Sequence, residues 1–138
     1  MRFELVDQVI ERSEGRIVTV KHVTSAEEYL ADHFPSFPVL PGVLMIESMV
    51  QAARRLATAI DPAKSRHVLA SVKALKYGHL VRPGDTLQVE VTLEKADSEG
   101  RLEFKGLGTV IRQGASGGSG DAPTAVSGKF SLRPLNPA

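Results

Sequence analysis

Residues 42 to 60, with the sequence GVLMIESMVQAARRLATAI, are the stretch that decides the fold. Apolar side chains recur in it at helical spacing, and other apolar residues fill most of the remaining faces of its first part. A helix that is apolar on nearly all sides is buried. We therefore predict one central helix over this range, enclosed by the rest of the chain.

Strand patterns occupy the sequence on both sides of this helix. Asp85 to Glu94 alternates apolar and polar residues, as a sheet with one buried face requires, and the turn residues 97 to 100 connect it to a second alternating run at 102 to 110. Residues 16 to 23 are rich in β-branched side chains, and shorter strands are expected near 68 to 77 and 126 to 132. The sequence predicts an α+β domain, an antiparallel sheet of five or six strands wrapped around the helix.

Composition excludes several classes of function. The chain has 138 residues, 17 Lys plus Arg, 16 Asp plus Glu and no cysteine, which fits a single domain over 1–138 without thiol chemistry. A net charge of +1 predicts no nucleic-acid partner, and no stretch is long and apolar enough for a membrane span or a signal peptide. We expect a cytoplasmic protein, with a flexible Gly/Ser-rich loop at 113–123.

Glu47 is the one formal charge between residues 34 and 53. An apolar environment favours the neutral form of a carboxyl group, so Glu47 is a candidate proton donor near neutral pH. A pairing with a buried Arg, or a position at a subunit interface, would explain the same charge and stays open at this point.

His33 opens the same segment, and prolines at 35, 38 and 41 hold the chain extended after it. A neutral imidazole is a suitable general base near pH 7, although a loop histidine is more often an ordinary polar residue. Gly42 follows at the start of the helix, where unpaired N–H groups favour a developing oxyanion, although it would also suit a tight turn. A base, an acid and an oxyanion donor are what elimination of water β to a thioester carbonyl requires.

Residues 33 to 51, HFPSFPVLPGVLMIESMVQ, resemble the signature HFPGxPxxPGVLxxEAxxQ of the hotdog-fold 3-hydroxyacyl-acyl carrier protein dehydratases. Residues 3 to 7 (FELVD) and 81 to 87 (VRPGDTL) are similar to two further family motifs, FLLVDRV and VxPGDxL. Residues 77 to 80 (YGHL) depart from the usual Phe-Arg-Arg-Pro, so two customary cations are missing there. Remaining candidates for carrier docking are Arg54, Arg55, Lys73, Lys76 and Arg82, for which ordinary solvated surface charge is the alternative.

The resemblance implies a role for each matching residue. His33 would be the catalytic base and Glu47 the acid, the Gly42 N–H would polarise the thioester carbonyl, and the Val39 carbonyl would orient the imidazole. Gln51, one turn after Glu47, would support the carboxyl, although an amide that fills the core fits this position as well. The implied reaction converts a (3R)-3-hydroxyacyl thioester into the trans-2-enoyl thioester and water, which makes the protein a hydro-lyase of fatty-acid or related lipid biosynthesis.

The same resemblance implies an apolar acyl tunnel and a homodimer with composite active sites, in a dimer or a trimer of dimers. Candidate tunnel residues are Phe34, Phe37, Leu40 and Leu44, for which ordinary core packing is the alternative. The substrate would be carried by acyl carrier protein or coenzyme A. We expect no cofactor and no metal, since His22 in a strand, His67 in a polar loop and His79 beside a turn lack metal-ligand spacing.

An acyl thioesterase and a non-catalytic acyl-binding subunit are the alternative functions.

Overall fold

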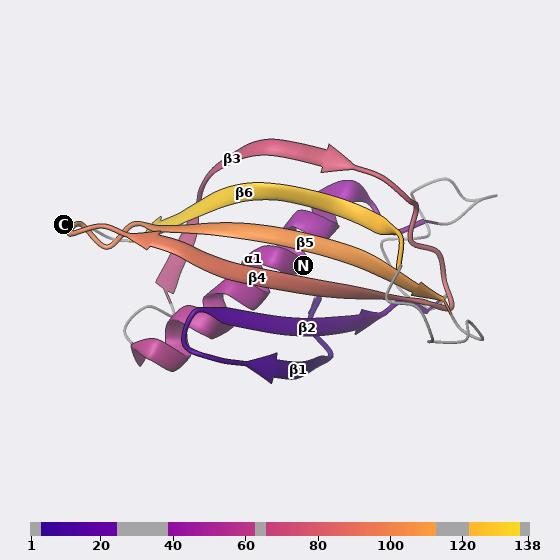
Figure 1. The fold of residues 1–138 in the computed structure, drawn as a ribbon, viewed down its shortest axis with the longest axis horizontal. Coiled ribbons are helices and arrows are strands. Elements are labelled where there is room, and N and C mark those ends of the chain that lie inside the picture. The colour runs from indigo at the N-terminus through magenta and orange to yellow at the C-terminus, as the bar shows by residue number, and fades with distance from the viewer. Residues whose placement is uncertain (1–3, 25–38, 63–65, 113–121, 136–138) are drawn as a thin grey trace.

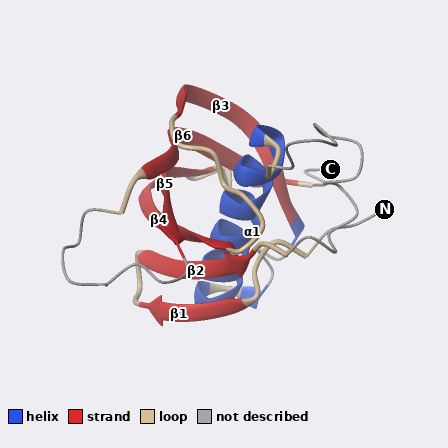
Figure 2. Cartoon of the chain, turned by 90° about the vertical axis from the view of Figure 1, so that its right-hand side faces the viewer, coloured by secondary structure: helices blue, strands red, loops and turns tan. Residues whose placement is uncertain are grey.

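A curved antiparallel sheet wraps around one long helix, α1 (Gly42–Ile60), in a computed structural model that describes residues 4–24, 39–62, 66–112 and 122–135 (Figures 1 and 2). The six strands lie in the order β1-β2-β4-β5-β6-β3, and every neighbouring pair is antiparallel. Their bounds are β1 Gln8–Arg12, β2 Arg16–His22, β3 His67–Tyr77, β4 Asp85–Ala96, β5 Leu102–Arg112 and β6 Thr124–Pro134.

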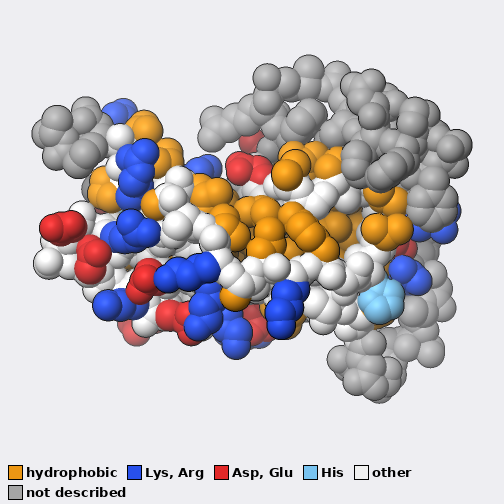
Figure 3. Space-filling view, turned by 90° about the horizontal axis from the view of Figure 1, so that it is seen from above, with side chains coloured by type: hydrophobic (Ala, Val, Ile, Leu, Met, Phe, Trp, Pro, Cys, Tyr) orange, Lys and Arg blue, Asp and Glu red, His pale blue; other side chains and the backbone are white. Residues whose placement is uncertain are grey.

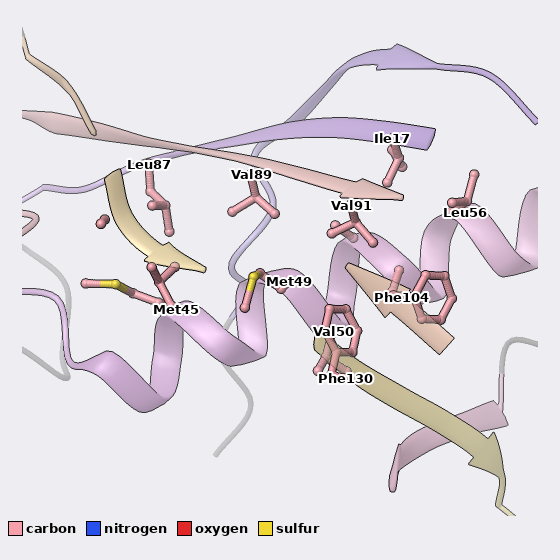
Figure 4. Close-up of a cluster of buried hydrophobic side chains, with 14 of the residues drawn as sticks. Ile17, Met45, Met49, Val50, Leu56, Leu87, Val89, Val91, Phe104 and Phe130 are labelled. Carbon is pink, nitrogen blue, oxygen red and sulfur yellow. The ribbon is translucent and has the colours of Figure 1, made fainter. Parts of the chain in front are cut away.

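The core lies between α1 and the concave face of the sheet. Met45, Met49 and Leu56 of α1 are each at most 3% exposed, and they face Leu87 and other strand residues in one cluster (Figure 4). The alternating pattern predicted for β4 is observed, with Leu87 and its period-two neighbours fully buried. Burial of this apolar surface is the main force that holds the helix against the sheet.

Gly106 allows α1 to approach β5 closely. A Cβ atom at this position would collide with the Sδ atom of Met49 and lie 3.2 Å from the Phe130 ring. Phe130 in turn stacks on Phe104, with ring centroids 5.4 Å apart. The missing side chain therefore makes room for the helix at the centre of the sheet.

Most of the predicted elements match the structure, with two differences. The helix has the predicted bounds, and the five expected strands are present with ends shifted by a few residues. β1 is an additional strand at the edge of the sheet that the sequence analysis did not predict, and His67 was wrongly placed in a polar loop. It begins β3, is 6% exposed, and its Nε2 atom lies 2.7 Å from the Gly100 carbonyl oxygen.

Within the described ranges, the single helix α1 does not combine the length and apolarity needed to cross a membrane. Of the loop predicted at 113–123, residues 113–121 lie outside the described part of the chain.

Candidate active site

Glu47 lies in the second turn of α1, on the side of the helix that does not face the sheet. Its side chain is half-buried, whereas the flanking core residues Met45 and Met49 are buried. The helical period places Gln51 one turn later on the same side, within reach of Glu47. The carboxyl group is therefore partly accessible while the helix that carries it is fixed by its other face.

The Gln51 side chain connects Glu47 to the N-terminal segment. Its Oε1 atom accepts a hydrogen bond of 2.8 Å from the Leu5 N–H, and its Nε2 atom donates to Glu47 Oε1 at 3.3 Å. Because a backbone N–H can only donate, the amide oxygen must face Leu5 and the amide NH₂ group must face Glu47. Gln51 therefore contacts the carboxyl group in one defined orientation, and its supporting role stays a prediction.

The N-terminal end of α1 presents backbone donors beside this carboxyl group. Leu44 and Met45 N–H groups donate to the Pro41 carbonyl at 3.0 and 3.3 Å, and among the described residues no acceptor is found for the N–H groups of Gly42 and Val43. Unpaired N–H groups and the helix dipole favour negative charge at this end. The Gly42 N–H can thus stabilise an oxyanion that approaches the helix axis.

Tyr77 of β3 covers Gly42. A Cβ atom on Gly42 would lie 2.7 Å from ring carbons of Tyr77 and 2.9 Å from its hydroxyl oxygen, so the ring packs directly on the glycine. Tyr77 is 51% exposed, which leaves the ring accessible from outside. Tyr77 belongs to the YGHL segment that departs from the family motif, but no sequence pattern indicates its contact with Gly42, because the two residues lie 35 positions apart along the chain.

A mostly apolar cavity of about 350 Å³ adjoins this end of the helix. Its walls come from the start of α1, the segment before it, the end of β3 and the residues that follow β3, and they comprise Val39, Leu40, Gly42, Val43, Met45, Tyr77, Gly78, His79, Leu80 and Ala125. Cavities of this size and character hold small apolar ligands. An acyl chain is a chemically suitable occupant.

The predicted site residues fall into four groups. Glu47, Gln51 and Gly42 lie on α1 as described, and Leu40 and Val39 are buried beside the cavity at 2% and 3% exposure. Leu44 is partly buried and packs against the core. His33, Phe34 and Phe37 lie outside the described residues. Their roles, and the orientation of the imidazole by the Val39 carbonyl, stay predictions.

Basic side chains gather in a second, polar groove of about 460 Å³ between α1, β1 and the N-terminal segment. Arg12, Arg54 and Arg55 line it together with Gln51 and Glu4. Arg54 also donates from Nε to the His67 carbonyl at 3.0 Å, which fixes its guanidinium group. Arg12 is an addition to the predicted set of cations, since it belongs to the strand that the sequence analysis did not predict.

Within the described ranges, no group of three or more His, Asp or Glu side chains could hold a metal ion. The chemistry that these residues offer is acid–base chemistry and hydrogen bonding, through a carboxyl group, an amide and backbone N–H groups.

The long helix enclosed by a six-stranded antiparallel sheet defines a hotdog fold. The structure is similar to the dehydratase heterocomplex ApeI:P from Xenorhabdus doucetiae, with a TM-score of 0.66 and 19% identity over 96% of this chain and 99% of that one. It is also similar to the hexameric thioesterase from Yersinia pestis, with a TM-score of 0.62 and 16% identity over 85% and 84% of the two chains. At these identities the likeness shows the fold.

Sequence comparison identifies the family. The family model described as ApeI dehydratase matches residues 9–117. The chain is 42% identical over 108 residues to the 3-hydroxyacyl-[acyl-carrier-protein] dehydratase FabZ of Polaromonas sp., covering 75% of this chain and 74% of that protein. It is 36% identical over 110 residues to the FabZ of Caldanaerobacter subterraneus, covering 78% and 77%. The chain belongs to the ApeI-like family of hotdog dehydratases.

Proposed function

We propose that the protein converts (3R)-3-hydroxyacyl thioesters, carried on acyl carrier protein, into trans-2-enoyl thioesters and water. The observation that carries the proposal is the Glu47 carboxyl group, which is half-buried and accepts a hydrogen bond from Gln51 at 3.3 Å. It lies on a helix whose first N–H groups have no acceptor among the described residues. The FabZ relatives at 36 to 42% identity support the same reaction. A cytoplasmic location in lipid biosynthesis is part of this proposal.

The chemistry follows from the groups present. His33 removes a proton from C2 of the substrate, and the electron pair moves into the thioester carbonyl, where the Gly42 N–H stabilises the enolate oxygen. Collapse of the enolate forms the double bond between C2 and C3 and breaks the bond between C3 and its hydroxyl oxygen. The Glu47 carboxyl donates the proton that lets this oxygen leave as water.

The proposal is tested by measuring dehydration of 3-hydroxyacyl thioesters and the reverse hydration of enoyl thioesters on a panel of substrates. The purified protein should hydrate crotonyl thioesters, and the absorbance of the enoyl thioester reports the rate. His33→Ala should reduce that rate by about 10² to 10⁴, with an unchanged thermal unfolding curve. A variant within tenfold of the wild-type rate would contradict the role of His33.

The same panel separates the two alternatives. A thioesterase would release free thiol from acyl-coenzyme A, which a thiol reagent detects, without a change in enoyl absorbance. A non-catalytic subunit would bind hydroxyacyl carrier protein and turn over none of the panel. Comparing coenzyme A with acyl carrier protein in the same assay identifies the preferred carrier. Comparing acyl groups of different lengths identifies the preferred chain length.

We further propose that two copies of the chain pair along β3 to complete the active sites. β3 lies at the end of the sheet, where β6 is its one neighbour among the described strands, and it carries exposed Leu69, Val72 and Tyr77. Seen from this side, hydrophobic side chains form a continuous patch (Figure 3). An unpaired strand of this kind is a template for a further strand, and a second copy supplies one of matching length. A trimer of such dimers is the larger assembly to look for.

The pairing can be tested with two matched lysine substitutions. Leu69→Lys on β3 places a charge in the proposed interface, while Ile10→Lys places one on β1 at the opposite edge, and the two side chains are 40% and 48% exposed. Leu69→Lys should weaken dimerisation by about tenfold or more and lower activity with it, as measured by light scattering over a dilution series. Equal behaviour of the two variants would place the interface elsewhere.

The acidic carrier protein would dock on the basic groove lined by Arg12, Arg54 and Arg55. Lys73, Lys76 and Arg82 remain further candidates. Reversing the charge of Arg55, which is exposed, should raise KM for carrier-bound substrate while leaving the rate with a short coenzyme A thioester unchanged.

A further inference from the structure

The N-terminal segment is fixed to α1 through both backbone polar groups of one residue, Leu5. The Leu5 N–H donates to Gln51 Oε1 at 2.8 Å, and the Leu5 carbonyl accepts from the Ser48 hydroxyl at 2.9 Å. Ser48 and Gln51 are three residues apart and lie on one face of the helix. Ser48 is 1% exposed, so its hydrogen bond is shielded from water. Two side chains of the helix therefore hold the Leu5 backbone at a fixed position.

The segment is also anchored to the sheet two residues later. The Asp7 N–H donates to the Val20 carbonyl at 2.8 Å, and the Asp7 carboxylate accepts from the His22 N–H at 2.7 Å. The Leu5 side chain is fully buried. A displacement of this backbone would expose that side chain and break these hydrogen bonds together, so the Asp7 contacts act with the Ser48 hydrogen bond to set the position of the Leu5 N–H.

The position of the Leu5 N–H determines which end of the Gln51 amide faces Glu47. The Leu5 N–H fixes Gln51 Oε1, and this forces the Gln51 NH₂ group toward Glu47. One carboxyl oxygen of Glu47 accepts from Gln51, and in the proposed reaction the other oxygen would donate the proton to the leaving hydroxyl. A rotated amide would instead present its oxygen to the carboxyl group.

Ser48 departs from the signature that residues 33 to 51 resemble. The family signature has Ala directly after the catalytic Glu, whereas this sequence has Ser48. A serine hydroxyl in a helix can bond to its own helix backbone, but here it reaches Leu5, 43 residues away in sequence. The extra hydrogen bond therefore adds a fixed point to the segment that orients Gln51.

We infer that Ser48 is a positioning residue for catalysis: through the backbone of Leu5 it fixes the Gln51 amide, and thereby the Glu47 carboxyl group. The inference rests on the proposed dehydratase function. It differs from a purely structural role because loss of Ser48 changes the geometry of the acid as well as the stability of the fold.

The test compares Ser48→Ala with Ser131→Ala. Ser131 is a matched control: it is 2% exposed, and its hydroxyl bonds to Ser71 and Arg101 at 2.7 and 2.9 Å, within the sheet. Both variants lose a buried hydroxyl and should show similar unfolding midpoints. Ser48→Ala should lower kcat about three- to tenfold, the effect of one lost hydrogen bond, with KM within about twofold. Ser131→Ala should keep the wild-type kcat.

A second variant decides the question if Ser48→Ala fails to fold. In Gln51→Glu the new carboxylate can still accept from the Leu5 N–H, so the segment stays anchored, but it cannot donate to Glu47. Two neighbouring carboxyl groups disfavour the charged form, so the alkaline limb of the pH–rate profile should move to higher pH as kcat falls. Unchanged pH limbs in Gln51→Glu would overturn the inference.

The outcomes separate the inference from the function on which it rests. If the wild-type protein does not dehydrate any thioester of the panel, the proposed function itself fails. If the wild type is active and Ser48→Ala matches Ser131→Ala in kcat and pH profile, the function stands and the positioning role of Ser48 is wrong.

Discussion

The two sides of α1 serve different purposes. The side facing the sheet consists of Met45, Met49, Ala52 and Leu56, each at most 3% exposed and packed in the core. The other side carries Glu47 and Gln51, which are half-buried and linked by a hydrogen bond. One helix thus carries the packed core on one side and the proposed catalytic groups on the other.

This separation explains how a carboxyl group can be kept partly out of water at low cost. The buried methionines and leucine supply the apolar area that holds the helix, so Glu47 need not contribute to packing. The two sides should therefore respond independently to substitution: one through the free energy of unfolding, the other through the rate.

The largest expected effect is on the chemical side, in Glu47→Gln. The amide oxygen can accept the same hydrogen bond from Gln51, but the side chain can no longer donate an acidic proton to the leaving hydroxyl. Dehydration should fall by about 10² to 10⁴, while the free energy of unfolding changes by about 0.5 kcal/mol or less. Glu103→Gln, a half-buried carboxylate on β5, should keep full activity. A Glu47 variant with a tenth of the wild-type rate would place the acid elsewhere.

Met49→Ala should show the converse behaviour on the packed side. The side chain is 1% exposed and fills the space that Gly106 leaves open, so its removal creates a cavity and should cost about 2 to 5 kcal/mol. Denaturant unfolding measures this loss. Activity per folded molecule should stay close to wild type well below the unfolding midpoint. Ile60→Ala, at a 49% exposed position of the same helix, should lie within about 0.5 kcal/mol of the wild type.

Gly42→Ala tests whether stability and activity can be separated at the start of α1. The new methyl group would lie 2.7 Å from the Tyr77 ring, which must move, and overpacking of this kind costs about 1 to 3 kcal/mol. Adding Tyr77→Ala should restore the unfolding midpoint because it removes the clash. Dehydration should stay impaired in the double variant, since the methyl group still obstructs the approach to the Gly42 N–H. Recovery of the rate together with stability would contradict the role of that N–H.

The smallest effect is expected for a pair remote from α1. Arg16 donates a hydrogen bond of 3.0 Å to the Glu90 carboxylate, and this lowers the pKa of Glu90 below its ordinary value. A lowered pKa contributes stability that is present above the ordinary value and is lost as the pH falls through the folded value. Glu90→Gln should therefore lower the unfolding midpoint slightly at pH 7 and not at all in strong acid. The effect is small because both side chains are more than a third exposed.

Local patterns predicted the parts of the fold that bury one face. The helix bounds and the alternating strand at 85 to 94 follow from apolar spacing, which burial imposes directly on the sequence. β1 was missed because four of its five residues are exposed at a sheet edge, so the QVIER sequence carries no alternation to detect. Pairing with β2 makes this segment a strand, and that pairing is a tertiary contact.

In the candidate site, too, local features could be predicted from the sequence, and long-range contacts could not. The spacing from His33 to Glu47 and the position of Gln51 one turn after Glu47 are local features of the sequence. The helix places the Gln51 amide 3.3 Å from Glu47. Leu5 contacts Ser48 and Gln51, which follow it by 43 and 46 positions in the sequence. No sequence motif predicts these two contacts. Likewise, His67 is buried because its ring meets the Gly100 carbonyl 33 residues further along the chain.

The Leu5 amide also offers a spectroscopic measure of the site. Its proton is held by a side chain rather than by a neighbouring strand, so its exchange with solvent deuterium requires the N-terminal segment to leave Gln51. The exchange rate of this one proton therefore reports how often the Glu47 carboxyl group loses its support. Amide exchange at a single position can follow the integrity of the active site in the absence of substrate.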